Sequence, residues 1–417
     1  MLRCGLLGRK LIHSYSPAIH GILAGYSYRL FEVEPENLAS FLEGEDFHGL
    51  NVTIPYKKDV IPFCRELSPL ARAIGSVNAI LRRPDGTLYG DNTDARGFLA
   101  MLKRSAIPVE GKKVLVLGSG GSSLSVRHVL SECDAGQIIV VSRGGENHYG
   151  NLERHADAQV IVNTTPVGMY PDTDRAPVSL SAFPHLEGVL DLVYNPARTR
   201  LLMDAQARDL PHMGGLTMLV GQARAACELF TGQAVDAEKE QLAARMLRQK
   251  MENLVLIGMP GCGKTTVGKA LAEQLGRPFI DADLALEEAA GISIPEIFSR
   301  EGEAGFRQRE AQTLKQLGSQ SGLVIATGGG CVTREENYFH LRQNGIIIFL
   351  ERSTALLARE GRPLSQGDLE AMYRQRLPLY RRFACLTAHN DAPAETVVKN
   401  ILSAVDCAQD VNNQTEG

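Results

Sequence analysis

The stretch GMPGCGKTT at 258–266 has the residue types and spacing of a phosphate-binding loop. It follows the apolar run NLVLI, and Gly258 is separated by four residues from Gly263, Lys264 and Thr265. In such loops backbone N–H groups hold phosphate, the lysine reaches the outer phosphates and the hydroxyl binds Mg²⁺. A glycine turn that binds no phosphate is the alternative. The predicted nucleoside triphosphate site consists of Gly258, Gly261, Cys262, Gly263, Lys264, Thr265 and Thr266.

Two later segments, FIDADLAL (279–286) and VIATGGG (324–330), each predict a short strand with unusual residues at its end. Of Asp281 and Asp283, one carboxylate can steer the Mg²⁺ shell and the other can accept a proton from an attacking hydroxyl. A helix cap at Asp283 is the structural alternative. The three glycines let backbone approach a small ligand. Residues 300–400 contain twelve Arg and only two Lys. Because arginine binds carboxylates and phosphates through two hydrogen bonds, this excess suits a small anionic acceptor and ATP.

A second glycine-rich turn, GSGGSS at 118–123, follows the apolar run KKVLVL. With the next helix and strand it predicts a βαβ unit, the usual setting of a dinucleotide-binding loop. Ser123 replaces the third glycine of the G-x-G-x-x-G pattern, so a plain strand-to-helix turn is the alternative. Arg143 ends the second strand, and an arginine there favours NADP over NAD. The predicted loop contacts are Gly118, Ser119, Gly120, Gly121 and Ser122.

The stretch HSYSPAIH near the N-terminus combines hydroxyls with a helix start. Ser16 and Pro17 predict the N-cap and the first residue of a helix. Ser14 and Ser16 can jointly donate to a carboxylate at that positively polarised helix end, and capping alone is the alternative.

A lysine and an aspartate lie among amides and hydroxyls within residues 1–94. Asn51, Thr53 and Lys57 alternate in NVTIPYK, which predicts one face of an extended segment. Asn78 comes from SVNAI, and Asp94 begins a helix, where a simple cap is the alternative. Such a set suits a polyhydroxylated substrate whose ketone is protonated as hydride arrives.

These groups must be positioned by an α/β framework, because apolar strand-like runs alternate with helical patterns along all 417 residues. Mostly parallel sheets are expected, and the length fits two or three domains. The predicted blocks are 1–94, a substrate-binding lobe; 95–214, a dinucleotide-binding domain; 215–251, helices that return to the first lobe; 252–404, the triphosphate-binding domain; and 405–417, a disordered tail.

Bulk composition excludes several functional classes. The net charge of -4 gives no reason to expect nucleic acid or an anionic membrane as a partner. No apolar run approaches the ~20 residues that a membrane span requires, and the N-terminus predicts a strand in place of a signal peptide. The eight cysteines are scattered without a C-x-x-C pair, which favours a reducing cytoplasm.

The third block resembles shikimate kinase over essentially all of 252–404. The shared motifs, in order, are GMPGCGKTT, DAD, GFRQRE, ATGGG, GRPL (361–364) and RLPLYRR (376–382). The resemblance implies Asp283 as the base towards the acceptor hydroxyl and Asp281 near Mg²⁺. The stretch from Arg359 through Leu369 is shorter than the family's lid. The other implied contacts are Arg307 and Arg376 to the shikimate carboxylate, Gly328, Gly329 and Gly330 lining that pocket, and Arg362 over the phosphates.

The first 250 residues resemble shikimate dehydrogenase. The shared motifs are SYSP, NVTIPYK, VNAI, GDNTD, GSGG, NTTPVGM (163–169), DLVYNP (191–196) and GLTMLVGQA (215–223). The resemblance implies Lys57 and Asp94 as the catalytic pair, with Lys57 supplying the proton. Met169 and Met218 would lie near the nicotinamide, with core packing as the alternative. The other implied contacts are Ser14 and Ser16 to the carboxylate, and Asn51, Thr53, Asn78, Gln222 and Tyr194 to hydroxyls.

The cofactor motif of that family, NRTxxR, has here become SRGGEN, with Arg143 kept and Glu146 added. This departure implies weaker binding of the 2′-phosphate and partial use of NAD. The two resemblances together imply a two-lobed dehydrogenase with a Rossmann-like NADP domain, followed by a P-loop kinase domain of the nucleoside-monophosphate-kinase type.

The implied function is NADPH-dependent reduction of 3-dehydroshikimate, followed by phosphorylation of shikimate with ATP and Mg²⁺. Two alternatives stay open, namely that one half is a degenerate ligand-sensing module and that the dehydrogenase accepts quinate.

Overall fold

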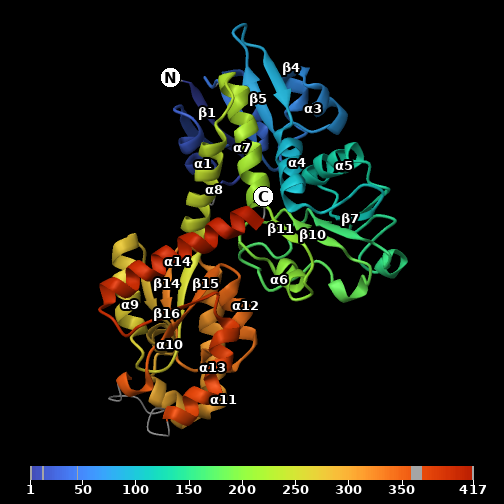
Figure 1. Ribbon diagram of the computed structural model, residues 1–417. Helices are drawn as coiled ribbons and strands as arrows, with labels where there is room; N and C mark the ends of the chain where they lie inside the picture. The colour runs from blue at the N-terminus through green and yellow to red at the C-terminus, as the bar shows by residue number, and fades with distance from the viewer. Residues whose placement is uncertain (1, 12–13, 45, 358–368, 416–417) are drawn as a thin grey trace. The chain divides into compact units, whose positions relative to one another are not determined.

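The chain forms two compact α/β units in the computed structural model (Figure 1). The first unit is Met1–Tyr194 with Leu201–Arg248, and the second unit is Asn195–Arg200 with Gln249–Gly417. The structure describes residues 2–11, 14–44, 46–357 and 369–415.

The first sheet of the first unit has six strands in the order β2-β1-β3-β5-β6-β4. Strands β1, β2 and β3 are parallel, whereas β5 is antiparallel to both of its neighbours. Its strands are β1 (Arg3–Gly8), β2 (Ser27–Glu32), β3 (Gly49–Val52), β4 (Cys64–Leu67), β5 (Ala79–Arg82) and β6 (Leu88–Asp91). Its helices are α1 (Ser16–Leu23), α2 (Leu38–Gly44) and α3 (Pro69–Ile74), with short 3-10 helices η1 (Pro35–Asn37) and η2 (Ile61–Phe63).

The second sheet of the first unit has five parallel strands in the order β11-β10-β9-β7-β8. Most of the residues in β7, β9 and β10 are buried apolar side chains, as expected of a parallel sheet covered on both faces. Its strands are β7 (Lys113–Leu117), β8 (Gln137–Val141), β9 (Val160–Asn163), β10 (Gly188–Asp191) and β11 (His212–Gly214). Its helices are α5 (Gly121–Glu132), α6 (Arg200–Gln206), η3 (Leu152–His155) and η4 (Leu180–Ala182).

Helices α4 (Thr93–Ser105) and α7 (Leu216–Thr231) pack backbone against backbone in the first unit. A Cβ on Gly97 would lie only 2.5 Å from the carbonyl oxygen of Met218, and a Cβ on Gly221 only 3.3 Å from the Cα of Gly97. Glycine at both positions therefore permits the close approach. Helix α8 (Ala237–Met251) follows α7.

The second unit contains a five-stranded parallel sheet in the order β13-β14-β12-β15-β16. The long helix α11 is kinked at Gly302, whose φ of 68° is left-handed. The strands are β12 (Asn253–Ile257), β13 (Phe279–Asp281), β14 (Val324–Ala326), β15 (Gly345–Glu351) and β16 (Leu386–His389). The helices are α9 (Lys264–Leu275), α10 (Ala282–Ala290), α11 (Ile294–Ser319), α12 (Glu336–Arg342), α13 (Leu369–Phe383), α14 (Ala394–Thr415), η5 (Cys331–Thr333) and η6 (Thr354–Leu356).

The segment Asn195–Arg200 belongs to the second unit, although the sequence placed it in the dinucleotide-binding domain. Arg198 lies 2.6 Å from the buried carboxylate of Glu252, and its backbone N–H donates to the carbonyl of Gln343. The backbone N–H of Ala197 donates to the side-chain oxygen of a further residue of this unit, Asn344. These are long-range contacts, which no local pattern predicts.

The prediction of a disordered tail over 405–417 is wrong for most of that segment, because α14 extends to Thr415. Val398, Ile401 and Val405 follow a helical period and are buried in the core of the second unit, which anchors the part of α14 that leads into this segment. Residues 416–417 lie outside the described part of the chain. No helix within that described part is both long and apolar enough to cross a membrane.

Candidate active sites

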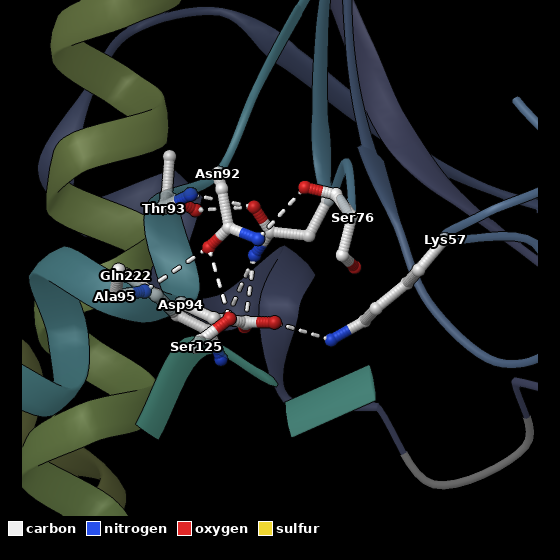
Figure 2. A network of polar contacts seen from close by, with 9 residues as sticks. Lys57, Ser76, Asn92, Thr93, Asp94, Ala95, Ser125 and Gln222 are labelled. Atoms are coloured by element: carbon white, nitrogen blue, oxygen red, sulfur yellow. Dashed lines mark hydrogen bonds and ion pairs between the residues drawn. The ribbon is translucent and has the colours of Figure 1, made fainter. Parts of the chain in front are cut away.

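Lys57 and Asp94 meet in the first unit, as the sequence predicted for a catalytic pair. The Lys57 Nζ lies 2.5 Å from Oδ2 of Asp94, whose side chain is almost completely buried (Figure 2). Lys57 follows β3 and Asp94 lies in the first turn of α4, so the pair joins two separate elements. A lysine in this setting can deliver a proton, and the carboxylate holds it in place.

An amide network fixes the carboxylate of Asp94 (Figure 2). Asn78 donates from Nδ2 to Oδ1 of Asp94 at 2.8 Å and lies 3.4 Å from Oε1 of Gln222 on α7. Its own Oδ1 accepts from the backbone N–H of Thr93 at 2.6 Å. The close packing of α4 and α7 brings Gln222 to this network, so three predicted site residues form one cluster.

Asp94 is not a helix cap, which rules out the alternative interpretation of this residue. Asn92 is the N-cap of α4, because its Oδ1 accepts from the backbone N–H of Ala95 at 3.1 Å. Asn92 also donates to the carbonyl of Ser76 and accepts from the hydroxyl of Ser125 on α5 (Figure 2). The cap therefore ties α4 to the helix that follows the glycine-rich loop.

The predicted cap at Ser16 is wrong by one residue. Tyr15 is the N-cap of α1, and Ser16 is the first helical residue. The hydroxyl of Ser14 accepts from the backbone N–H of Ser16 at 3.2 Å, so a side chain upstream of the helix satisfies this donor. Helix ends are poorly defined by sequence at the level of one residue.

The extended segment predicted for Asn51, Thr53 and Lys57 is shorter than expected. Strand β3 ends at Val52, and Lys57 lies in the turns that follow. Turns therefore bring Lys57 to Asp94, whereas strand alternation would have placed it with Asn51 and Thr53. Asn51 itself lies within β3 and is nearly buried.

The glycine-rich loop of the first unit lies between β7 and α5, with Gly118 in a left-handed conformation (φ 106°) and Gly120 as the N-cap. A Cβ on Gly121 would lie 3.5 Å from Cδ of Lys57, so the loop adjoins the lysine that the sequence predicted to be catalytic. Ser119 precedes the N-cap of α5 and Ser122 lies in its first turn, and the first N–H groups of a helix, which have no partner within it, can bind a pyrophosphate. The βαβ prediction for this region is confirmed.

The remaining predicted contacts of the dehydrogenase differ in how exposed their side chains are. Arg143 is exposed just after β8, and Met169 is 44% exposed. Met218 is buried in the core beside α4, which favours plain packing for this methionine. The ring of Tyr194 makes an edge contact with Tyr15 at 6.2 Å, next to the two serines.

The phosphate-binding loop of the second unit has the backbone that its glycines permit. Gly258, Gly261 and Gly263 have φ values of 144°, 81° and 96°, which side chains rarely adopt. Lys264 is buried, and its Nζ donates to the carbonyls of Gly258 at 2.9 Å and Met259 at 3.0 Å. Cys262 is buried, while Thr265 and Thr266 lie in the first turn of α9.

Thr265 and Asp281 form a pair that fits Mg²⁺. The hydroxyl of Thr265 lies 2.9 Å from Oδ2 of Asp281, and Mg²⁺ typically takes only one or two protein ligands besides water and phosphate. The other oxygen of Asp281 accepts from the backbone N–H of Asp283, so Asp281 is the N-cap of α10. The alternative interpretation of Asp283 as a helix cap is therefore wrong, and its carboxylate does not cap α10.

The carboxylate of Asp283 faces the three glycines after β14. A Cβ on Gly328 would lie 2.8 Å from Oδ1 of Asp283 and 2.8 Å from Oε1 of Glu310. A Cβ on Gly330 would lie 2.3 Å from both terminal nitrogens of Arg307. Only glycine lets these charged groups approach the backbone so closely.

Arg376 completes this cluster from α13 by donating to the carbonyl of Gly329 at 3.2 Å. Tyr380, one turn later, donates to the same carbonyl. Arg307, Arg376, Asp283 and the three glycines are therefore gathered, as predicted. Arg362 and the shortened lid lie outside the described residues.

Glu310 is a site residue that the sequence analysis missed. It lies 2.7 Å from Arg307, and its second oxygen has no hydrogen-bond partner among the described residues. Burial raises the pKa of Glu310, and Arg307 acts in the opposite direction. The signal was present three residues after Arg307 in GFRQRE, since residues i and i+3 share a helix face.

The fold and sites define a dinucleotide-dependent dehydrogenase joined to a P-loop kinase. The chain belongs to the shikimate dehydrogenase family and carries a shikimate kinase domain. Residues 6–80 match the model of the shikimate dehydrogenase substrate binding domain, 215–239 that of the shikimate 5'-dehydrogenase C-terminal domain, and 260–406 that of shikimate kinase.

Related proteins support the assignment of the first unit. A shikimate dehydrogenase (NADP(+)) from Clostridium perfringens (strain SM101 / Type A) is 39% identical over 258 residues, which are 57% of this chain and 95% of the relative. A shikimate 5-dehydrogenase from Thermus thermophilus, solved in complex with NADP(H) and shikimate, is 35% identical with a TM-score of 0.54, covering 59% of this chain and 99% of that one. A chorismate mutase/shikimate 5-dehydrogenase fusion protein from Clostridium acetobutylicum is 34% identical with a TM-score of 0.57, covering 60% of this chain and 98% of that one.

Proposed function

We propose that this bifunctional enzyme reduces 3-dehydroshikimate to shikimate with NADPH and then phosphorylates the 3-hydroxyl of shikimate with ATP. The observation that carries the proposal is the presence of two assembled sites in one chain. Lys57 and Asp94 adjoin the glycine-rich loop of the first unit. Lys264 and Asp283 lie in the second unit with the arginine and glycine cluster.

In the reduction, Lys57 donates a proton from Nζ to the C3 oxygen of the substrate. NADPH, when bound, supplies the hydride to C3, so that one hydride and one proton convert the ketone to a hydroxyl. Asp94 lies 2.5 Å from Nζ of Lys57 and holds the lysine in position. Ser14 and Ser16 bind the substrate carboxylate, while Asn51, Thr53, Asn78, Gln222 and Tyr194 bind its other oxygens.

In the phosphorylation, Asp283 accepts the proton of the 3-hydroxyl as that oxygen attacks the terminal phosphate of ATP. Arg307 and Arg376 bind the shikimate carboxylate and thereby orient the hydroxyl. Lys264 stabilises negative charge on the phosphates, while Thr265 and Asp281 hold Mg²⁺.

A coupled assay with purified full-length protein tests both reactions. We expect oxidation of NADPH when 3-dehydroshikimate is added, and formation of ADP once ATP and Mg²⁺ are present. Supplied shikimate should yield ADP without NADPH. Absence of ADP with authentic shikimate would reject the kinase, and absence of NADPH oxidation would reject the dehydrogenase.

The same assay decides the two rival functions. A degenerate regulatory half predicts that one activity is absent, whereas all four groups Lys57, Asp94, Lys264 and Asp283 are present and assembled. Quinate as the preferred substrate predicts faster NADP⁺ reduction with quinate than with shikimate.

All eight cysteines are free, in keeping with our proposal of a cytoplasmic enzyme that acts on small molecules without nucleic-acid or membrane partners.

A further inference from the structure

A buried aromatic cluster lies behind the substrate-binding strand β3 of the first unit. It consists of His20, Tyr26, Tyr28 and Phe230. The rings of His20 and Tyr28 stack at 4.1 Å and 10°, and Nδ1 of His20 lies 2.5 Å from the Tyr26 hydroxyl. A Cβ on Gly49 would lie 2.4 Å from Phe230, so glycine at this position lets the ring lie on β3.

The hydroxyl of Tyr28 connects this cluster to the predicted substrate contacts. Tyr28 on β2 donates to Oδ1 of Asn51 on β3 at 2.8 Å, reaching across β1. Burial raises the pKa of Tyr28 well above its usual range, and a hydrogen bond with Ser16 acts in the opposite direction. The hydroxyl is therefore protonated at neutral pH and is shared between Asn51 and Ser16.

His20 stacks on the ring of Tyr28. Burial lowers the pKa of His20 to about 3, while a side-chain hydrogen bond with Asn51 acts to raise it. The imidazole is thus neutral at neutral pH and brings no charge to the site. The hydroxyl of Tyr28 therefore makes the hydrogen bond that fixes the amide of Asn51, and the sequence analysis identified neither Tyr28 nor His20.

We infer that Tyr28 is a positioning residue for the dehydrogenase, because its hydroxyl fixes Oδ1 of Asn51 and leaves the Nδ2 donors for a substrate oxygen. This inference rests on the proposed function of the first unit. An amide offers an acceptor at one end and donors at the other, and its orientation is set by its hydrogen-bond partners. Without the Tyr28 donor the amide of Asn51 can rotate and present its acceptor to the substrate.

Tyr28→Phe is the direct test, because phenylalanine fills the same space without the hydroxyl. We expect the KM for 3-dehydroshikimate to rise about tenfold, in line with the loss of one buried hydrogen bond. The kcat should stay within about twofold, since the hydroxyl touches neither Lys57 nor the cofactor loop. NADPH binding, the melting temperature and the kinase activity of the same chain serve as controls for folding.

Tyr26→Phe is the matched control in the same cluster. Its hydroxyl contacts His20 and not Asn51, so the KM should change by less than about twofold. Equal KM values for Tyr28→Phe and the wild type would overturn the inference. So would equal increases in Tyr28→Phe and Tyr26→Phe, because that result would indicate general loosening of the cluster.

A double-mutant cycle separates positioning from independent binding. If Tyr28 acts through Asn51, the variant carrying Tyr28→Phe and Asn51→Ala should have the KM of Asn51→Ala alone. If the two substitutions instead raise the KM by the product of their separate effects, the inference is overturned.

Asn51→Asp covers the case in which Tyr28→Phe does not fold. The aspartate can still accept from Tyr28, but it has lost the donors, so its KM should rise at least as much as that of Tyr28→Phe. A wild-type KM for Asn51→Asp would overturn the assigned orientation. A wild-type protein that does not reduce 3-dehydroshikimate would instead reject the proposed function, whereas normal wild-type turnover with an unchanged KM in Tyr28→Phe rejects only the role of Tyr28.

Discussion

The two glycine-rich loops occupy equivalent places in two sheets but differ in shape. Each loop follows an interior strand of a parallel sheet, β7 or β12, and leads into a helix. The dinucleotide loop has a single left-handed glycine at its first position, Gly118, whereas the triphosphate loop has three, at 258, 261 and 263. The second loop also ends in a buried lysine.

This difference follows from what each loop must hold. A dinucleotide presents a pyrophosphate to the end of one helix, and a short turn with close backbone approach is sufficient. A triphosphate that transfers its terminal group needs N–H groups around it and a cation against the developing charge. The comparison predicts that damage at either loop remains confined to its own reaction.

The largest expected effect is Lys57→Ala. Loss of the proton donor should lower the rate of 3-dehydroshikimate reduction by about 10³-fold. Phosphorylation of supplied shikimate, measured as the formation of ADP, should stay at the wild-type rate. Loss of both activities in a variant with a normal melting curve would show that the two sites are coupled.

Lys264→Ala is the reciprocal variant. Removing the cation from the phosphates should lower kcat of the kinase by about 10²- to 10³-fold. NADPH oxidation with 3-dehydroshikimate should be unchanged, because Lys264 donates hydrogen bonds only to its own loop among the described residues. A comparable fall in the dehydrogenase rate would contradict the separation.

Arg143→Ala tests the part of the dinucleotide site that departs from its family. The KM for NADPH should rise about tenfold through the loss of one charge-assisted contact, while the KM for NADH should hardly change. Arg175→Ala, another arginine of the first unit, serves as the control for a general change in charge. Equal effects on NADPH and NADH would refute a phosphate contact by Arg143.

Gly118→Ala and Gly263→Ala compare the loops directly. Both glycines have positive φ, and an added Cβ would meet Thr164 at 2.7 Å or Asn390 at 2.5 Å. Each variant should raise the KM of its own nucleotide about fivefold, since the left-handed backbone costs about 1–2 kcal/mol. Gly291→Ala has positive φ but open space around it, so it controls for backbone strain alone.

The last expected effect concerns stability and leaves catalysis at neutral pH unchanged, namely a pH dependence of unfolding through His20. Burial lowers the pKa of His20 from 6.5 to about 3, so the unfolded chain takes up a proton that the folded unit refuses. Stability of the first unit should therefore fall as the pH drops from 6.5 towards 3. In His20→Gln the melting temperature of that unit should change less over this interval, and parallel curves for the two proteins would contradict the assignment.

The sequence predicted those features that local patterns encode. The strands β7 and β12, the helix α5 and both glycine-rich loops lie where apolar runs and glycines placed them. Arg307, Arg376 and Asp283 were assigned by resemblance and are gathered in the structure.

The errors concern features that depend on distant contacts or on single-residue boundaries. Asp94 and Asp283 were each open to interpretation as caps, but neighbouring residues Asn92 and Asp281 cap those helices. Any of these short polar side chains can cap, and only tertiary partners decide which one does. Tyr28 was missed because its partner Asn51 lies on another strand, and a tyrosine in a strand carries no signal of its own.

The place of Asn195–Arg200 bears on how this protein is made. A ribosome completes these six residues before it begins Gln249–Gly417, so Arg198 is synthesised well before its partner Glu252. The second unit therefore becomes complete only with a piece of chain that is already present from earlier synthesis. A gene fragment that starts at Gln249 would encode Glu252 and β12 but not Arg198, and the isolated product should be less stable than the same unit in the full-length chain.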